Sequence, residues 1–314
     1  MNYILITGGL GFIGSNLAKH FLQDPNNFII VVDNLVTGKH SNLDSHKNLK
    51  VFEMNITNTN FFSFIVNTYP TIHEIYNFAC IASPKTYQEY PLDTLNACYI
   101  GTSNCLYLAK FYSCKFLQAS TSEIYGDPLI TPQSINYYGN VNTVGCRSMY
   151  DEGKRVAETL VSVYRNDCIN PKDYHIARIF NTFGNNMDKN DGRVVSNFIN
   201  NALENKDLEI YGNGTQTRSL IYIDDQIQGL ITLMHSNLFL ANVGSEFEIN
   251  IKSFAFKILE LIPESKSKIV FKEKLMDDPM QRRGDYSEMY SLGWTPKIQL
   301  DLGLKLTIEY YKSL

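Results

Sequence analysis

The segment ITGGLGFIGSNLA (residues 6–18) places a run of glycines between an apolar stretch and a stretch with helical periodicity. Gly8, Gly9, Gly11 and Gly14 satisfy both the G-x-x-G-x-x-G and the G-x-G-x-x-G patterns. Glycine suits these positions because the turn is tight and its backbone must approach a pyrophosphate closely, while the helix that follows directs its free N–H groups at that anion. The segment therefore predicts a strand–turn–helix unit that binds a dinucleotide.

Asp33 ends the next apolar run, FIIVVD (residues 28–33), 19 residues after Gly14. A carboxylate at this place can accept hydrogen bonds from both hydroxyls of the adenosine ribose, and it would repel a 2′-phosphate. We therefore predict NAD, rather than NADP, as the cofactor. The alternative is a glycine-rich turn and a helix-capping aspartate with no ligand.

Short apolar runs alternate with helical patterns in the first half of the chain, and the runs cover residues 3–8, 28–33, 50–55, 74–79, 115–120 and 174–180. This alternation predicts an α/β fold with a Rossmann-type, doubly wound parallel sheet. We place this NAD-binding domain at residues 1–180 and a smaller C-terminal substrate-binding domain at residues 181–314. We expect a strand near residues 218–225 to return to the first domain.

The composition is that of a folded protein, with 44% hydrophobic and 19% charged residues in 314. The net charge of −4 and the scattered basic residues argue against nucleic acid or an anionic membrane as a partner. No apolar stretch approaches the roughly 20 residues that span a bilayer, and the apolar start of the chain is too short for a signal peptide.

Six cysteines occur without a C-x-x-C pair and without histidines at metal-ligand spacing. We interpret them as small buried or half-buried side chains in a reducing compartment, rather than as disulfide or zinc partners. We therefore expect a cytoplasmic protein without a metal.

Two further segments carry groups that handle protons. SMYDEGKRVAETLVSVY (residues 148–164) reads as a helix with Tyr150 and Lys154 on one face. A lysine ammonium beside a phenol stabilises the phenolate, which would lower the tyrosine pKa and make a general base. STSEIYG (residues 120–126) gathers hydroxyl groups and a glutamate at the end of an apolar run. A lone Y-x-x-x-K pair is common, but here it accompanies a dinucleotide segment.

This combination closely resembles the extended short-chain dehydrogenase/reductase family, which includes the nucleotide-sugar epimerases and dehydratases. Ser122–Glu123 is the pair typical of the UDP-glucuronate decarboxylases, also called UDP-xylose synthases. The resemblance covers essentially the whole chain, in segments 139–160, 177–184, 191–199, 211–225, 277–283 and 292–300.

The resemblance implies that the C4 hydroxyl of UDP-glucuronate is oxidised with NAD, that CO2 leaves the resulting β-keto acid, and that the resident cofactor then returns its hydride. It assigns catalytic roles to Thr121, Ser122, Glu123, Tyr150, Lys154 and Arg282. It assigns cofactor binding to Gly8, Gly11, Phe12, Ile13, Gly14, Asp33, Asn34, Thr37, Gly38, Asn55, Ile56 and Ala79, together with Tyr150 and Lys154. It assigns substrate binding to Tyr87, Asn181, Arg193, Tyr211 and Arg218, with Arg178 as a further cation.

Some positions depart from the pattern of the family, and these departures put the exact substrate preference in question. Asn55 stands where an aspartate usually contacts adenine, although it keeps an acceptor. The other departures flank the sugar pocket and comprise Ile81, Lys85, Cys98 and the Asn185–Asn186 pair.

Other readings remain open. Arg282, with Arg283, Asp277 and Asp278, could form an exposed charge cluster, and Tyr211 could pack in the core. A 4,6-dehydratase or 4-epimerase of another nucleotide sugar is the nearest rival enzyme. A catalytically silent dinucleotide-binding sensor would not need Thr121, Glu123, Tyr150 and Lys154 together.

We also expect a homodimer. The resemblance implies that helices near residues 101–112 and 151–165 pair with their mates in a four-helix bundle. Apolar residues on more than one face support this expectation, among them Leu106, Leu108, Phe111, Leu160 and Val163.

Overall fold

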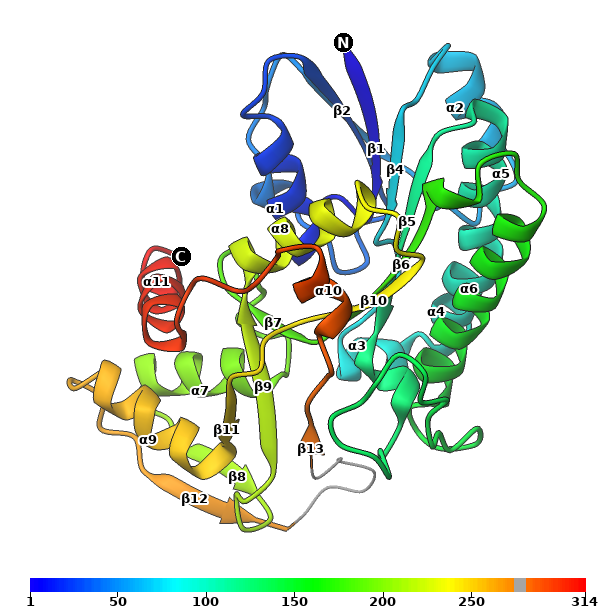
Figure 1. The fold of residues 1–314 in the computed structure, drawn as a ribbon. Helices are drawn as coiled ribbons and strands as arrows, with labels where there is room; N and C mark the ends of the chain where they lie inside the picture. The colour runs from blue at the N-terminus through cyan, green and yellow to red at the C-terminus, as the bar shows by residue number, and fades with distance from the viewer. Residues whose placement is uncertain (274–280) are drawn as a thin grey trace.

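A seven-stranded parallel sheet forms the centre of the N-terminal part of the computed structural model, which describes residues 1–273 and 281–314 (Figure 1). The order of the strands across the sheet is β10-β6-β5-β4-β1-β2-β3. Their bounds are β1 (Asn2–Thr7), β2 (Asn27–Asp33), β3 (Leu49–Glu53), β4 (Glu74–Asn77), β5 (Lys115–Thr121), β6 (Tyr174–Ile179) and β10 (Leu240–Val243). The first six lie within two residues of the predicted apolar runs. The central runs are rich in apolar residues because helices cover both faces of the sheet, while the edge strand β3 is only partly buried.

One face carries α1 (Phe12–Phe21) and α8 (Ile223–Met234). The other carries α2 (Phe61–Thr68), α5 (Thr102–Tyr112) and α6 (Ser148–Asn166), with α4 (Pro91–Asn96) and a π-helical segment, η2 (Ala97–Gly101), leading into α5. The short helix α3 (Pro84–Glu89) and the 3-10 turns η1 (His40–Asn42), η3 (Ser122–Tyr125) and η4 (Pro171–Asp173) connect these elements. This arrangement confirms the doubly wound, Rossmann-type fold.

The C-terminal part is built on smaller sheets. β9 (Thr217–Tyr222) pairs in parallel with β7 (Asn181–Phe183) and β13 (Gln281–Arg282), and antiparallel with β11 (Glu248–Asn250). β8 (Leu208–Tyr211) pairs in parallel with β12 (Ile269–Lys272). The helices are α7 (Val194–Leu203), α9 (Ile251–Leu261), α10 (Ser287–Ser291) and α11 (Leu300–Lys312).

The expectation that a strand near residues 218–225 returns to the first domain is wrong in its detail. β9 joins the smaller sheet, and α8 begins directly after it at Ile223. The chain returns instead through α8 and β10, which pairs with β6 at the edge of the large sheet. The division of the chain at residue 180 stays a prediction.

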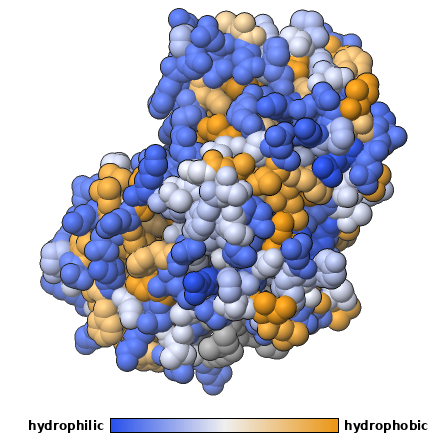
Figure 2. Space-filling view, in the orientation of Figure 1, coloured by the Kyte–Doolittle hydropathy of each residue, from blue (hydrophilic) through white to orange (hydrophobic). Residues whose placement is uncertain are grey.

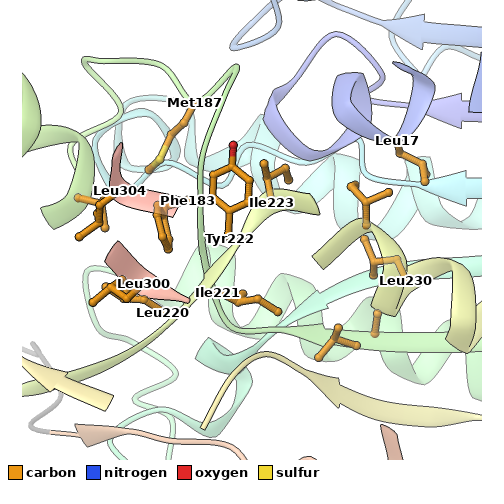
Figure 3. Packing of buried hydrophobic residues seen from close by; sticks show 14 of the residues in the cluster. Leu17, Phe183, Met187, Leu220, Ile221, Tyr222, Ile223, Leu230, Leu300 and Leu304 are labelled. Carbon is orange, nitrogen blue, oxygen red and sulfur yellow. The ribbon is translucent and has the colours of Figure 1, made fainter. Parts of the chain in front are cut away.

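One hydrophobic core joins the two parts, as Figure 3 shows. Leu304 of α11 lies at one end of the view, and Leu17 of α1 and Leu230 of α8 lie at the other. Between them the rings of Phe183 and Tyr222 pack edge to face, with their centroids 5.7 Å apart. Because this core is continuous, the residues that the two parts contribute to a common site are held in a fixed relation.

No helix within residues 1–273 and 281–314 is both long and apolar enough to cross a membrane. Asp277 and Asp278, considered above as neighbours of Arg282 in a surface cluster, lie outside the described residues.

Candidate active site

A cavity of about 1080 Å³ opens at the carboxyl ends of the parallel strands and is also lined by residues of the C-terminal part. Every residue predicted to hold the cofactor lines this cavity. So do all the predicted catalytic residues, and the substrate-side residues Asn181, Arg193, Tyr211 and Arg218. The structure therefore brings together groups that are up to 274 positions apart in the sequence, from Gly8 to Arg282.

The glycine turn packs tightly against neighbouring backbone, which only residues without a Cβ allow. Gly8 has a φ of +68°, and a Cβ there would lie 2.8 Å from the backbone of Phe78 and Ala79. A Cβ on Gly14 would overlap the carbonyl oxygen of Gly8. Gly11 begins α1 without a side-chain cap, so the free N–H groups of the helix face the turn. These features fit a bound pyrophosphate.

Asp33 is buried at the end of β2, where its carboxylate accepts hydrogen bonds from the backbone N–H groups of Leu10 and Leu35, both at 2.9 Å. Burial raises its pKa above the ordinary value, and these hydrogen bonds oppose the rise. A Cβ on Gly38 would lie 2.6 Å from Asp33 Oδ1, so the glycine keeps the neighbouring chain close to the carboxylate. This placement fits a carboxylate that faces the ribose hydroxyls of NAD.

Thr121, Tyr150 and Lys154 meet where β5 ends. Thr121 Oγ1 caps the η3 turn by accepting from Glu123 N at 3.3 Å, and the side chain also hydrogen-bonds with Tyr150. Lys154 Nζ donates to the carbonyl oxygen of Ala119 at 2.8 Å and lies 5.8 Å from the centre of the Tyr150 ring. The structure therefore brings Thr121, Tyr150 and Lys154 together, and their role in proton transfer stays a prediction.

The expected lowering of the Tyr150 pKa is not found. Tyr150 is only 6% exposed. Burial raises the pKa of its phenol well above the ordinary value, the nearby Cys80 adds to the rise, and the hydrogen bond with Thr121 opposes it. The prediction considered the charge of Lys154 and left out the desolvation of the phenol, which has the larger effect here.

Glu123 lies between two arginines. Its Oε1 accepts from Arg282 Nη1 at 2.8 Å, and its Oε2 pairs with Arg147. The three side chains are 10–20% exposed, which strengthens their mutual attraction. Arg147 was missed by the sequence analysis, although it stands three residues before Tyr150 in the same segment. The pairing of Arg282 with Glu123 in the cavity argues against the surface-cluster reading.

The comparisons with known proteins agree with this geometry. The model of the NAD dependent epimerase/dehydratase family matches residues 4–244, which is more than half of the chain. The chain belongs to this family. A zebrafish (Danio rerio) relative, UDP-glucuronic acid decarboxylase 1, is 42% identical over 98% of this chain and 72% of its own length. UDP-glucuronic acid decarboxylase 6 of Arabidopsis thaliana is 43% identical over 98% of this chain and 88% of its own length.

Solved structures of epimerases have the same fold. The UDP-glucose 4-epimerase of Thermotoga maritima, determined with UDP-glucose, superposes with a TM-score of 0.90 and 26% identity. The superposition covers 99% of each chain. The epimerase/dehydratase fold therefore extends beyond residue 244 to the C-terminal part.

The substrate side of this epimerase/dehydratase cavity is lined by cations and polar groups. Arg193 lies at the start of α7 and forms a bidentate ion pair with Asp191. Arg218 Nη1 donates to the carbonyl oxygen of Thr217 at 2.8 Å, and Tyr211 donates to Glu209 at 3.1 Å. Tyr211 is half-buried at the cavity wall, which disagrees with the core-packing alternative.

Two predicted residues lie away from the cavity. Tyr87 is fully buried behind Tyr150, and the two rings stack with centroids 5.1 Å apart and an interplanar angle of 7°. It therefore supports the ring of Tyr150 and does not line the cavity. Arg178 is buried in a bidentate pair with Glu158, at 2.8 and 3.0 Å. Its charge is neutralised by this glutamate, and the side chain does not line the cavity.

The departures from the family pattern have structural explanations at two positions. Asn186 donates to Ser15 Oγ at 2.9 Å and so ties its loop to α1. Asn55 lines the cavity and accepts from the backbone N–H of Thr57 at 3.0 Å, so its oxygen orders the turn after β3. Among the described residues, no group of three or more histidine, cysteine, aspartate or glutamate side chains could hold a metal ion.

Proposed function

We propose that this protein is an NAD-dependent UDP-glucuronate decarboxylase that forms UDP-xylose. The observation that carries the proposal is the arrangement of Glu123 between Arg147 and Arg282 in the cavity that also contains Tyr150 and Lys154. Decarboxylases from plants and vertebrates support the proposal, because they are 40–43% identical to this chain over nearly its whole length.

Thr121 at the end of β5 and two residues of α6 move the first proton. Tyr150, hydrogen-bonded to Thr121, takes the proton from the C4 hydroxyl of the sugar, and the ammonium of Lys154 stabilises the phenolate that forms. The glycine turn and Asp33 would hold NAD, which would supply the hydride acceptor for C4 and the source of the hydride that restores it. Tyr87 holds the Tyr150 ring in place during both transfers.

Oxidation at C4 makes the sugar carboxylate a β-keto acid, which loses CO2 readily. Arg282 and Arg147 supply charge-assisted hydrogen-bond donors for this carboxylate, and Ser122 and Glu123 stand beside them. We also assign to these four residues the protonation of C5 that follows the loss of CO2. We assign the diphosphate to Arg218, the uridine to Tyr211, and the sugar to Asn181 and Arg193, because all four line the same cavity.

The test is to incubate the purified protein with UDP-glucuronate and NAD, to measure CO2, and to identify the nucleotide product by mass and NMR. We expect UDP-xylose from the native protein. Tyr150→Phe, which keeps the ring stack with Tyr87, should lose roughly 10²-fold or more of the rate because the base is gone. Consumption of UDP-glucose or dTDP-glucose without CO2 release would favour a dehydratase or epimerase instead.

We also propose a homodimer. Exposed apolar side chains gather on the outer face of four neighbouring elements, α4, η2, α5 and α6, and this bundle face comprises Leu92, Leu95, Tyr99, Ile100, Tyr107, Phe111, Val156 and Val163. Figure 2 shows hydrophobic side chains at this edge of the molecule, over α2 and α5. Of the residues expected at the interface, Leu106 and Leu108 are fully buried in the protomer, while Phe111 and Val163 are 56% and 58% exposed. A second copy is the occupant that would cover this face.

A cytoplasmic location is the last part of the proposal. Cys80, Cys98, Cys105, Cys114 and Cys168 are free thiols, which fits a reducing compartment. Cell fractionation with antibody detection would test it.

A further inference from the structure

Two cysteines meet beside the catalytic groups. Cys80 follows β4 and lines the cavity, and Cys98 is buried in η2. Their sulfur atoms are 3.4 Å apart, although the residues are 18 positions apart in the sequence. The proposed mechanism uses neither thiol.

The surroundings of the pair favour reaction at Cys80. The Cys98 thiol hydrogen-bonds to Cys80, and this bond together with the charge of Lys154 lowers the pKa of Cys80 to about 7, against the effect of burial. The pKa of Cys98 is raised well above its ordinary value by the same hydrogen bond and by burial. The geometry and the charge of Lys154 therefore favour Cys80, which also lines the cavity, as the thiol of the pair that reacts first.

We propose that Cys80 and Cys98 form a redox-sensitive dithiol that peroxides oxidise to a disulfide, and that this disulfide inhibits the enzyme reversibly. The Cys80 thiolate attacks one oxygen of hydrogen peroxide, the O–O bond breaks, and a sulfenic acid forms while hydroxide leaves and takes up a proton as water. Cys98 then attacks the sulfenic sulfur, the S–S bond forms, and a second water leaves. Two thiols are oxidised and one peroxide is reduced.

The disulfide would disturb the site because both cysteines contact its walls. The sulfur atoms must approach from 3.4 Å to about 2.05 Å. Cys80 directly follows the Phe78–Ala79 backbone, which packs on Gly8 of the glycine turn. Cys98 packs on α6 at Gly153, where an added Cβ would lie 3.1 Å from its sulfur. Bond formation therefore pulls the cofactor side of the cavity toward the helix that carries Tyr150 and Lys154.

The test treats the purified protein with hydrogen peroxide, blocks the remaining thiols, and measures mass and turnover in parallel. Before the thiols are blocked, we expect a loss of about 2 Da per chain, and peptide mapping after blocking should locate a Cys80–Cys98 cross-link. Turnover should fall about tenfold or more, since a displacement near 1 Å at a reacting centre has effects of this size. Dithiothreitol should restore both. The mass measurement does not depend on which sugar is the substrate. The cross-link can therefore be detected even if the proposed function is incorrect.

Three variants identify the role of each thiol. Cys98→Ser keeps a hydrogen-bond donor but has no second sulfur, so Cys80 should stop at the sulfenic acid and be trapped by dimedone. Cys98→Ala removes the donor as well, so alkylation of Cys80 should need a higher pH. Cys146→Ser removes an exposed thiol as a matched control and should leave the cross-link unchanged. A cross-link elsewhere, or a Cys80–Cys98 disulfide with full turnover, would refute the proposal.

Discussion

Glu123 accepts from two arginines, and this pairing holds the charges at the point where a substrate carboxylate would arrive. Glu123→Gln keeps the shape but removes one negative charge, so it weakens both pairs at once. We expect CO2 release from UDP-glucuronate to fall by about 10²-fold, the size of a lost acid–base or charge contact in an active site. Binding of NAD, measured by calorimetry, should be unchanged because Glu123 lies outside the glycine turn.

Glu152→Gln is the matched control for this prediction. Glu152 pairs with Arg155 on α6, away from the residues that line the cavity. Its replacement should change neither measurement. Full CO2 release by Glu123→Gln would show that we have the wrong role for this carboxylate.

We expect Asp33 to determine the choice between NAD and NADP. Its buried carboxylate would face the extra phosphate of NADP, and the repulsion is poorly screened there. We expect NAD to bind about tenfold or more tightly than NADP, which is about 1.4 kcal/mol or more. Calorimetric titration with each cofactor measures this difference directly, and equal affinities would contradict the assignment.

The sequence predicted which single residues belong to the site where those residues follow a motif of fixed spacing. The glycine pattern and the Y-x-x-x-K spacing put Gly8, Gly14, Tyr150 and Lys154 into one cavity, as the structure confirms. Arg147 has no such pattern, because its position at Glu123 depends on how η3 and α6 pack together. The raised pKa of Tyr150 also needed the structure, since burial is a property of the fold.

The helices α5 and α6 present the side chains that we expect at the dimer interface. Phe111→Glu would place a charge in that interface, and desolvation of the charge should dissociate the dimer. Light scattering at micromolar concentration should then give the monomer mass, against a dimer mass for the native protein. Phe256→Glu on α9 is the control, because Phe256 is 57% exposed and Phe111 is 56% exposed. A monomeric native protein would defeat the proposal.

At the scale of elements, the large sheet was predictable because its strands are buried on both faces and read as apolar runs. β10, Leu240–Val243, was missed by the sequence analysis, which listed no apolar run there. β9 was found but given to the wrong sheet. An apolar run indicates that a strand is buried, but it carries no information on which neighbour it pairs with.

The stability of the whole molecule should depend on pH through His175. This side chain of β6 is 1% exposed, its Nδ1 lies 2.7 Å from the carbonyl oxygen of Leu238, and burial lowers its pKa to about 4. The folded protein thus binds the proton less tightly than the unfolded chain, where the pKa is about 6.5. The contribution of neutral His175 to the free energy of unfolding is therefore complete above about pH 6.5. It is lost as the pH falls toward 4, and the loss is at most about 3 kcal/mol.

Denaturant unfolding between pH 4 and pH 7.5 measures this effect. His175→Gln should flatten the acid side of the stability profile, since the variant has no proton to take up on unfolding. His46→Gln changes an exposed histidine and should leave the profile as it is. If the stability of His175→Gln fell on the acid side as much as that of the native protein, other groups would be responsible for the fall.

The late return of the chain to the large sheet has a consequence for synthesis on the ribosome. A fragment that ends at residue 180 would lack β10 and α8, so β6 would become an open, apolar edge, and the face that carries α1 and α8 would lose part of its cover. Such edges pair readily with other chains. The nascent chain must therefore emerge beyond residue 243 before its first sheet is closed, and until then it is a natural client for chaperones.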